Sequence, residues 1–181
     1  MKIGNKIFDT ENKTYIMGIL NVTPDSFSDG GKYNQMDQAL LHVEEMIADG
    51  ADILDIGGES TRPGHTRITD EEEICRIVPV IERIKKEYDI PVSVDTYKSQ
   101  VAKEALEAGA DLVNDIWGLK ADAKMAPLLA KYKVPCCIMH NRKNMEYKNF
   151  LEDITEDLKE SIWLAKEAGI QEDKIIVDPG V

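Results

Sequence analysis

The strongest constraint on the fold is a regular alternation of short apolar segments and amphipathic segments along the chain. Apolar runs that predict buried strands occupy residues 15–20, 52–56, 91–94, 111–114, 134–139 and 174–177. Most intervals between these runs carry apolar residues at helical spacing, which predicts helices packed on the strands. This βα alternation is typical of a parallel sheet covered by helices.

Two of the amphipathic intervals show the helical pattern in detail. Apolar side chains recur at i, i+3, i+4 and i+7 from Met36, and Gly50 then supplies a stop signal. In the next interval Thr69 and Glu72 have the spacing of a capping box at a helix start. Both segments are therefore expected to be surface helices.

The remaining helices are placed by weaker signals. We expect one over residues 97–108 with Thr96 as its cap, and another over residues 153–168. Pro127 lies inside the helical pattern of residues 122–132, and this position predicts a late start or a kink because an interior proline costs about 3 kcal/mol.

Each predicted strand ends in polar residues, and this placement separates two α/β architectures. In a closed barrel the carboxyl ends of the strands converge on one mouth, whereas an open doubly wound sheet spreads them along an edge. We therefore expect a TIM (β/α)8 barrel, of which this chain holds about the first six βα units, with residues 2–13 forming a small hairpin at its bottom. The strand-end residues are Asn21, Gly57, Gly58, Glu59, Asp95, Asn114, Asp115, His140, Asn141 and Asp178.

Two long polar loops follow the first two predicted strands. Residues 21–31 read NVTPDSFSDGG and residues 57–64 read GGESTRPG. Together these motifs resemble the two substrate loops of dihydropteroate synthase, a pterin-binding enzyme of folate biosynthesis, and the resemblance extends to the last residue. The motifs are long enough that chance agreement is excluded in practice.

The resemblance implies a transferase reaction. Its substrates are 6-hydroxymethyl-7,8-dihydropterin diphosphate and p-aminobenzoate, and its products are 7,8-dihydropteroate and pyrophosphate. Catalysis of this kind depends on orientation and electrostatics rather than on a strong base. The resemblance also implies a homodimer, an association common in the family.

The same resemblance assigns the site residues. Asp95 and Arg62 are the catalytic residues it implies, and Asn21 is its Mg²⁺ ligand, because an amide oxygen suits this hard cation. A carboxylate can accept two adjacent donors of a pterin, and a carboxamide can both donate and accept. The substrate-binding residues implied are Phe27, Thr61, Arg62, Pro63, Asp95, Asn114, Met139 and Asp178.

Structural roles compete with several of these assignments. Asp95, Asn114 and Asp178 could be strand-end caps, Asn21 a loop cap, and Phe27 a buried aromatic residue. For His140 we favour a structural role over that of a base. The basic stretch at residues 141–144 fits an anion-attracting patch and a solvated turn equally well.

Composition narrows the setting. Acidic residues outnumber basic residues by 34 to 22, which gives a net charge of −12 and argues against a nucleic-acid surface. Cys75, Cys136 and Cys137 form neither a CxxC pair nor an even disulfide framework. With no signal pattern and no long apolar run, we expect a cytoplasmic protein that binds neither nucleic acid nor membrane.

The chain is shorter than the enzymes it resembles. We expect residues 1–181 to form one pterin-binding domain, truncated after the sixth strand and lacking the lysine, arginine and histidine that the family carries on its last two strands. Two alternatives to the synthase follow. The chain could be a noncatalytic fragment that at most binds pterin, or a pterin-binding barrel of the methyltetrahydrofolate methyltransferase type.

Overall fold

The structure is a computed structural model that describes residues 1–23, 32–60, 66–144 and 146–180. Its core is a six-stranded parallel sheet in which every strand pairs with its neighbours in chain order. Because the order never reverses, the sheet has no switch point of the doubly wound kind, and the prediction of successive barrel units is confirmed. The strands are β3 (Met17–Asn21), β4 (Ile53–Gly57), β5 (Val92–Asp95), β6 (Leu112–Asp115), β7 (Cys136–Met139) and β8 (Ile175–Asp178).

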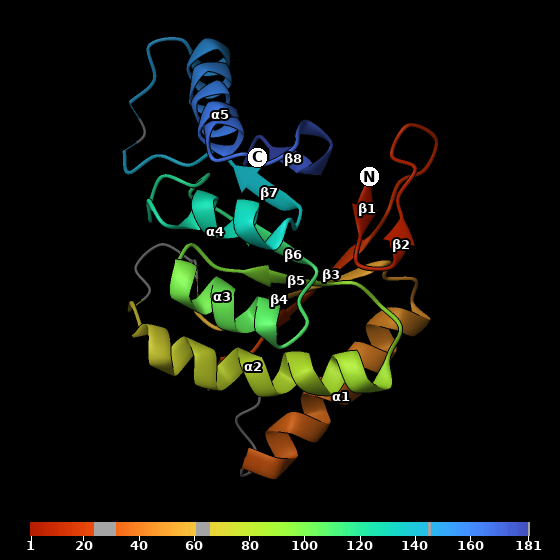
Figure 1. Ribbon diagram of the computed structural model, residues 1–181. Coiled ribbons are helices and arrows are strands. Elements are labelled where there is room, and N and C mark those ends of the chain that lie inside the picture. The colour runs from red at the N-terminus through yellow and green to blue at the C-terminus, as the bar shows by residue number, and fades with distance from the viewer. Residues whose placement is uncertain (24–31, 61–65, 145, 181) are drawn as a thin grey trace.

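The helices lie around one side of this sheet, from α1 at one end to α5 at the other (Figure 1). Their apolar stripes pack on the outward side chains of the strands, among them Leu54, Ile56 and Val94, and form the main core. The helices are α1 (Lys32–Ala48), α2 (Asp70–Glu87), α3 (Ser99–Glu107), α4 (Met125–Tyr132) and α5 (Phe150–Glu167), and a 3-10 turn η2 (Glu172–Lys174) precedes β8.

Helix boundaries follow local chemistry in two cases. The Glu72 amide donates to the Thr69 hydroxyl at 3.2 Å, so the capping prediction for α2 is confirmed. Helix α4 begins at Met125, so Pro127 lies in its first turn, where no intrahelical N–H bond is lost, and the late start is confirmed.

The predicted cap of α3 is wrong. Lys98, not Thr96, occupies the N-cap position and makes no side-chain cap bond. The Ser99 amide instead donates to the Asp122 carboxylate at 2.9 Å, and the Thr96 hydroxyl accepts from the Lys98 amide at 3.3 Å. The first turn of α3 is therefore capped by Asp122, which is distant in sequence, and not by the nearby Thr96.

A repeated aspartate ties neighbouring βα units together. Asp52 accepts from the Ile16 amide and Asp111 accepts from the Val92 amide, each at 2.9 Å. Each aspartate follows a helix-ending glycine with positive φ, at residues 50 and 109. Two copies of one sequence pattern therefore make the same contact to the start of the preceding strand.

The N-terminal hairpin closes one end of the sheet's inner face, as predicted. Strands β1 (Lys2–Ile3) and β2 (Lys6–Ile7) pair antiparallel, and Ile3 and Phe8 pack against the inward side chains of Ile53, Leu112 and Cys137. We call this layer the hairpin floor. It fills the amino-terminal end of the inner face with apolar side chains and leaves the carboxyl end to polar residues.

Candidate active site

Register brings the predicted strand-end residues together. Asn21 pairs with Gly57, Gly57 with Asp95, and Asp95 with Asn114, so the four residues form one row across β3 to β6. Partners in parallel strands share a face, and the row continues through Cys137, a residue of the hairpin floor, so its members point inward. The strand ends therefore present a carboxamide, a carboxylate and a second carboxamide at one level of the inner face.

Gly57 leaves a hollow in the middle of this row. A Cβ atom at residue 57 would lie 3.5 Å from Asn21 Oδ1 and 3.5 Å from Asp95 Oδ2. Both oxygens thus face the space above the glycine. A donor group or a cation placed there would meet two oxygen atoms from two different strands.

Asp95 has an unusual electrostatic environment. Its burial, together with the nearby charges of Asp55, Glu73, Asp115 and Glu59, raises the pKa of Asp95 to about 8. Its Oδ1 atom is buried and has no hydrogen-bond partner among the described residues. A buried acceptor of this kind needs a donor, which a ligand can supply.

A second buried carboxyl, Asp55, lies one layer deeper. Asp55 is 4% exposed, burial raises its pKa, and its Oδ2 accepts from Asn114 Nδ2 at 3.0 Å. The bond fixes the orientation of the Asn114 carboxamide. Asp55 Oδ1 and the neighbouring Ser93 Oγ make no bond of good geometry within the described part of the chain, although the Ser93 hydroxyl is close enough to lower the pKa of Asp55 and partly offset its burial. The layer of the inner face below the row therefore carries further polar atoms that can form hydrogen bonds with a ligand.

Asp55 was not singled out from the sequence, although a signal is present. It is the one charged residue within the apolar run of residues 52–56 that faces inward, since it pairs with Ser93 in register. Asp55 lies two residues before Gly57, and residues two apart on a strand share a face. Knowledge of which face points inward would therefore have identified Asp55 as a site residue.

Asp178 and Met139 complete the described part of the site. They pair in register at the ends of β7 and β8, and Asp178 Oδ1 accepts from the Gly180 amide at 2.8 Å. Because Asp178 lies two residues beyond Ile176, the partner of Cys137, it shares the inward face of the row. Four of the predicted residues, at positions 21, 95, 114 and 178, are thus brought to one face.

His140 is buried against α5. It is 6% exposed, and its Nε2 lies 3.1 Å from Asp157 Oδ2 on α5. Arg142 Nε donates to the same oxygen at 2.5 Å, and its NH1 donates to the Glu146 carbonyl. The Arg142 charge is paired with Asp157 and Asp153, which leaves it less able to attract an anion and favours the interpretation of residues 141–144 as a turn.

Four predicted residues lie outside the described residues: Phe27, Thr61, Arg62 and Pro63. The strands that lead into their segments are described and adjacent, since β3 and β4 pair along their whole length. The last residues of these two strands, Asn21 and Gly57, are register partners.

The described residues offer limited metal ligation. No group of three or more histidine, cysteine, aspartate or glutamate side chains in the described ranges could hold a metal ion. Asn21 is exposed and presents its Oδ1 toward the hollow above Gly57. This geometry fits an ion that receives most of its ligands from a substrate. Among the described helices, none is long and apolar enough to cross a membrane.

The chain is similar in sequence to proteins of one known family. The family described as pterin binding enzyme matches residues 17–181. A dihydropteroate synthase of Clostridium beijerinckii is 63% identical over 181 residues, all of this chain and 67% of that protein. One of Bacillus subtilis is 58% identical over 171 residues, 94% of this chain and 60% of that protein. The chain thus spans about two thirds of the length of these relatives.

Solved structures show the same relationship. Dihydropteroate synthase from Clostridium difficile, determined in the presence of pteroic acid, superposes with a TM-score of 0.94 at 52% identity, covering 97% of this chain and 67% of that one. The enzyme of Xanthomonas albilineans with 4-aminobenzoic acid gives a TM-score of 0.88 at 41% identity, covering 93% and 62%. These relatives are TIM barrels, so the fold class is confirmed.

Proposed function

The chain belongs to the pterin-binding enzymes, and from this premise we propose that it performs the chemistry of a dihydropteroate synthase. The reaction joins the amine of p-aminobenzoate to the methylene of 6-hydroxymethyl-7,8-dihydropterin diphosphate and releases pyrophosphate. Relatives with pteroic acid or 4-aminobenzoic acid support this choice of substrates. The observation that carries the proposal is the inward row of Asn21, Asp95 and Asn114 above the buried carboxyl of Asp55.

The pterin is assigned to the inner face. A pterin presents a ring N–H and an amino group side by side, and Asp178 can accept both. Asn114, held by Asp55, meets another edge of the ring system with a fixed carboxamide. The unpartnered Oδ1 of Asp95 supports this assignment, because it requires a donor that the described residues do not supply.

Asp95 is proposed as the charged group beside the reacting carbon. When the diphosphate leaves, positive charge develops on the pterin methylene, and an ionised Asp95 stabilises that charge in a site shielded from water. The raised pKa of the free site means that ligand binding has to favour the ionised form. Arg62 is the second proposed catalytic residue, since a guanidinium matches the charge of the departing diphosphate.

The second substrate and the metal are assigned to the mouth. Phe27, Thr61 and Pro63 are proposed to contact p-aminobenzoate, and Met139 to contact the pterin. Asn21 Oδ1 is the proposed protein ligand of Mg²⁺. When bound with the diphosphate, Mg²⁺ would neutralise charge on the leaving group.

Pteroic acid titration tests the pterin assignment. We expect Asn114→Ala and Asp178→Ala to weaken binding at least about tenfold, because each leaves hydrogen bonds unmade in a buried site. Asn144→Ala is the matched control, since Asn144 is exposed and lies outside the row. Equal affinity of all variants would contradict the assignment.

Turnover tests the reaction. Release of pyrophosphate that depends on p-aminobenzoate would exclude both the methyltransferase type and a noncatalytic binding fragment. Binding of pteroic acid without such release would limit the function to pterin binding. Cytoplasmic location and a homodimer stay predictions, for which cell fractionation and light scattering are the direct measurements.

A further inference from the structure

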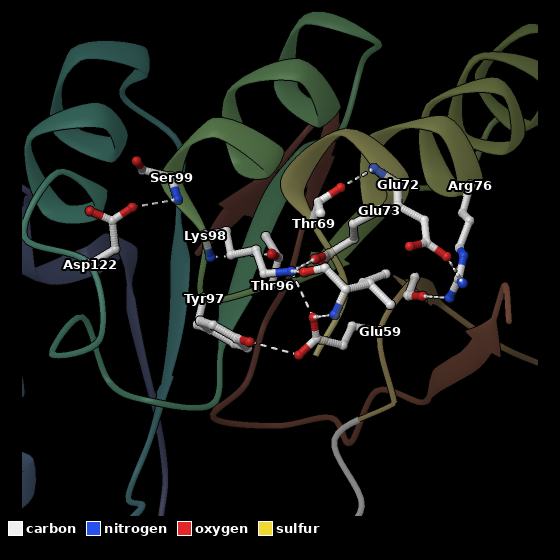
Figure 2. A network of polar contacts seen from close by, with 12 residues as sticks. Glu59, Thr69, Glu72, Glu73, Arg76, Thr96, Tyr97, Lys98, Ser99 and Asp122 are labelled. Atoms are coloured by element: carbon white, nitrogen blue, oxygen red, sulfur yellow. Dashed lines mark hydrogen bonds and ion pairs between the residues drawn. The ribbon is translucent and has the colours of Figure 1, made fainter. Parts of the chain in front are cut away.

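Lys98 joins three segments of the chain beside the candidate site. Its Nζ donates to Glu59 Oε2 at 2.6 Å, to Glu73 Oε2 at 2.7 Å and to the Ile68 carbonyl at 2.8 Å. Figure 2 shows this ammonium at the centre, reaching the end of β4, the first turn of α2 and the residues that precede that helix. We call Glu59, Ile68, Glu73, Tyr97 and Lys98 the Lys98 cluster.

Glu59 is held from both directions. Its Oε1 accepts from the Tyr97 hydroxyl at 2.6 Å, and its Oε2 accepts from the Ile68 amide at 3.2 Å as well as from Lys98. Two links therefore connect residues 59 and 68. The Glu59 carboxylate accepts from the Ile68 amide, and the Lys98 ammonium donates both to that carboxylate and to the Ile68 carbonyl. Both endpoints of the stretch between residues 59 and 68 are fixed to the β5–α3 turn.

The cluster is buried and strongly charged. The side chains of Glu59, Glu73 and Lys98 are 3%, 2% and 12% exposed. Burial alone would raise the pKa of Glu59, but hydrogen bonds from Lys98 and Tyr97 outweigh it and lower that pKa to about 2. For Glu73 burial dominates and raises the pKa. Removing the Lys98 ammonium would leave a buried anion without its partner.

Packing holds the same end of β4 against α2. Arg76 NH1 donates to the Gly58 carbonyl at 2.8 Å (Figure 2). A Cβ atom at residue 58 would lie 2.8 Å from Ile77 Cγ2 and 3.0 Å from Glu73 Cγ, so the backbone approaches the helix too closely for a side chain. The cluster thus fixes the segment that directly follows Gly57 of the site row.

We propose that Lys98 is a positioning residue for the p-aminobenzoate half of the reaction, acting through Glu59 and Ile68. The inference rests on the proposed function, in which Thr61 and Pro63 contact that substrate, and both lie in sequence between the two fixed endpoints. The proposed pterin contacts of Asn114 and Asp178 do not involve the cluster.

The central test is Lys98→Met, which keeps the length of the side chain and removes its charge. We expect the KM for p-aminobenzoate to rise about tenfold or more, since charge-assisted hydrogen bonds are lost, while the KM for the pterin diphosphate stays within about twofold. Lys98→Arg should recover much of the loss. Lys103→Met is the matched control, because Lys103 lies on α3, the helix that Lys98 precedes, and pairs only with Glu104 and Glu107 among the described residues.

Hydrogen exchange provides a readout independent of turnover. In Lys98→Met the Ile68 amide, which donates to Glu59, should exchange at least about tenfold faster, while that of Val113 in β6 stays protected. Unchanged exchange at Ile68 would overturn the inference, as would KM values that rise equally for both substrates. Should Lys98→Met not fold, Glu59→Gln must show the same pattern with a smaller amplitude. Absence of turnover in the unaltered chain would instead count against the proposed function and leave the exchange test valid.

Discussion

Replacing Asp95 by asparagine should make the protein more stable while removing its activity. In the unfolded chain the Asp95 carboxyl titrates near its ordinary value of 3.8, whereas in the folded protein burial and nearby carboxylates raise its pKa to about 8. Between these values the folded state binds one proton more than the unfolded state. The stability that this protonation supports is therefore fully present below the unfolded pKa and is lost as pH rises toward the folded pKa.

The magnitude follows from proton linkage. One proton contributes about 1.4 kcal/mol per pH unit, so wild-type protein should lose about 3 kcal/mol from this carboxyl between about pH 5.5 and about pH 7.5. The side chain introduced by Asp95→Asn has the same shape and does not titrate. The difference in unfolding free energy between variant and wild type should therefore grow by about 3 kcal/mol over that interval and level off above about pH 8.

Urea unfolding measures this difference. Fluorescence of Trp117 and Trp163 reports unfolding, and the free energy is extrapolated at each pH for both proteins. Asp52→Asn is the matched control, because the hydrogen bond from the Ile16 amide lowers the pKa of Asp52 and places its pH effect below this interval. A difference for Asp95→Asn that is flat across the interval would refute the electrostatic reasoning. Turnover near the wild-type rate would refute the catalytic role.

Three further substitutions test the architecture of the site. Gly57→Val should weaken pteroic acid binding more than about tenfold by filling the hollow between two site oxygens; unchanged affinity would mean that no ligand occupies it. Thr69→Ala should cost about 1 kcal/mol of unfolding free energy through loss of the bond to the Glu72 amide, and an unchanged urea midpoint would show that the cap contributes nothing. Phe8→Ala should cost about 3–5 kcal/mol as a cavity opens in the hairpin floor, so a loss below about 1 kcal/mol would indicate that the floor collapses around it.

The sheet and the order of its strands could be predicted because burial on both faces makes each parallel strand a continuous apolar run. The late start of α4 could be predicted from Pro127, since the restriction is local to the residue. The cap of α3 could not. Its acceptor, Asp122, is distant in sequence from Ser99, and a residue closer by, Thr96, offered an equally good local pattern.

Some residues of the site could likewise be predicted from the sequence and others could not. Its strand-end residues were recognisable because polar side chains interrupt apolar runs at the ends of strands. Asp55 was missed because inward and outward positions of a strand are distinguishable only when its register is known. The Lys98 cluster was missed because its members come from separate segments of the chain. Glu59 was recognised only as a strand-end residue, and Glu73 and Lys98 by themselves resemble ordinary surface charges.

The hairpin floor also constrains the order in which the molecule can assemble. Ile3 and Phe8 find their packing partners at Ile53, Leu112 and Cys137, so the first residues to be synthesised wait for β7 before they can dock. Contacts of such long sequence separation form late and slow folding, because the chain between them has to be ordered first. Until then the side chains of Ile3 and Phe8 stay exposed, and apolar groups exposed on a partly folded chain favour aggregation.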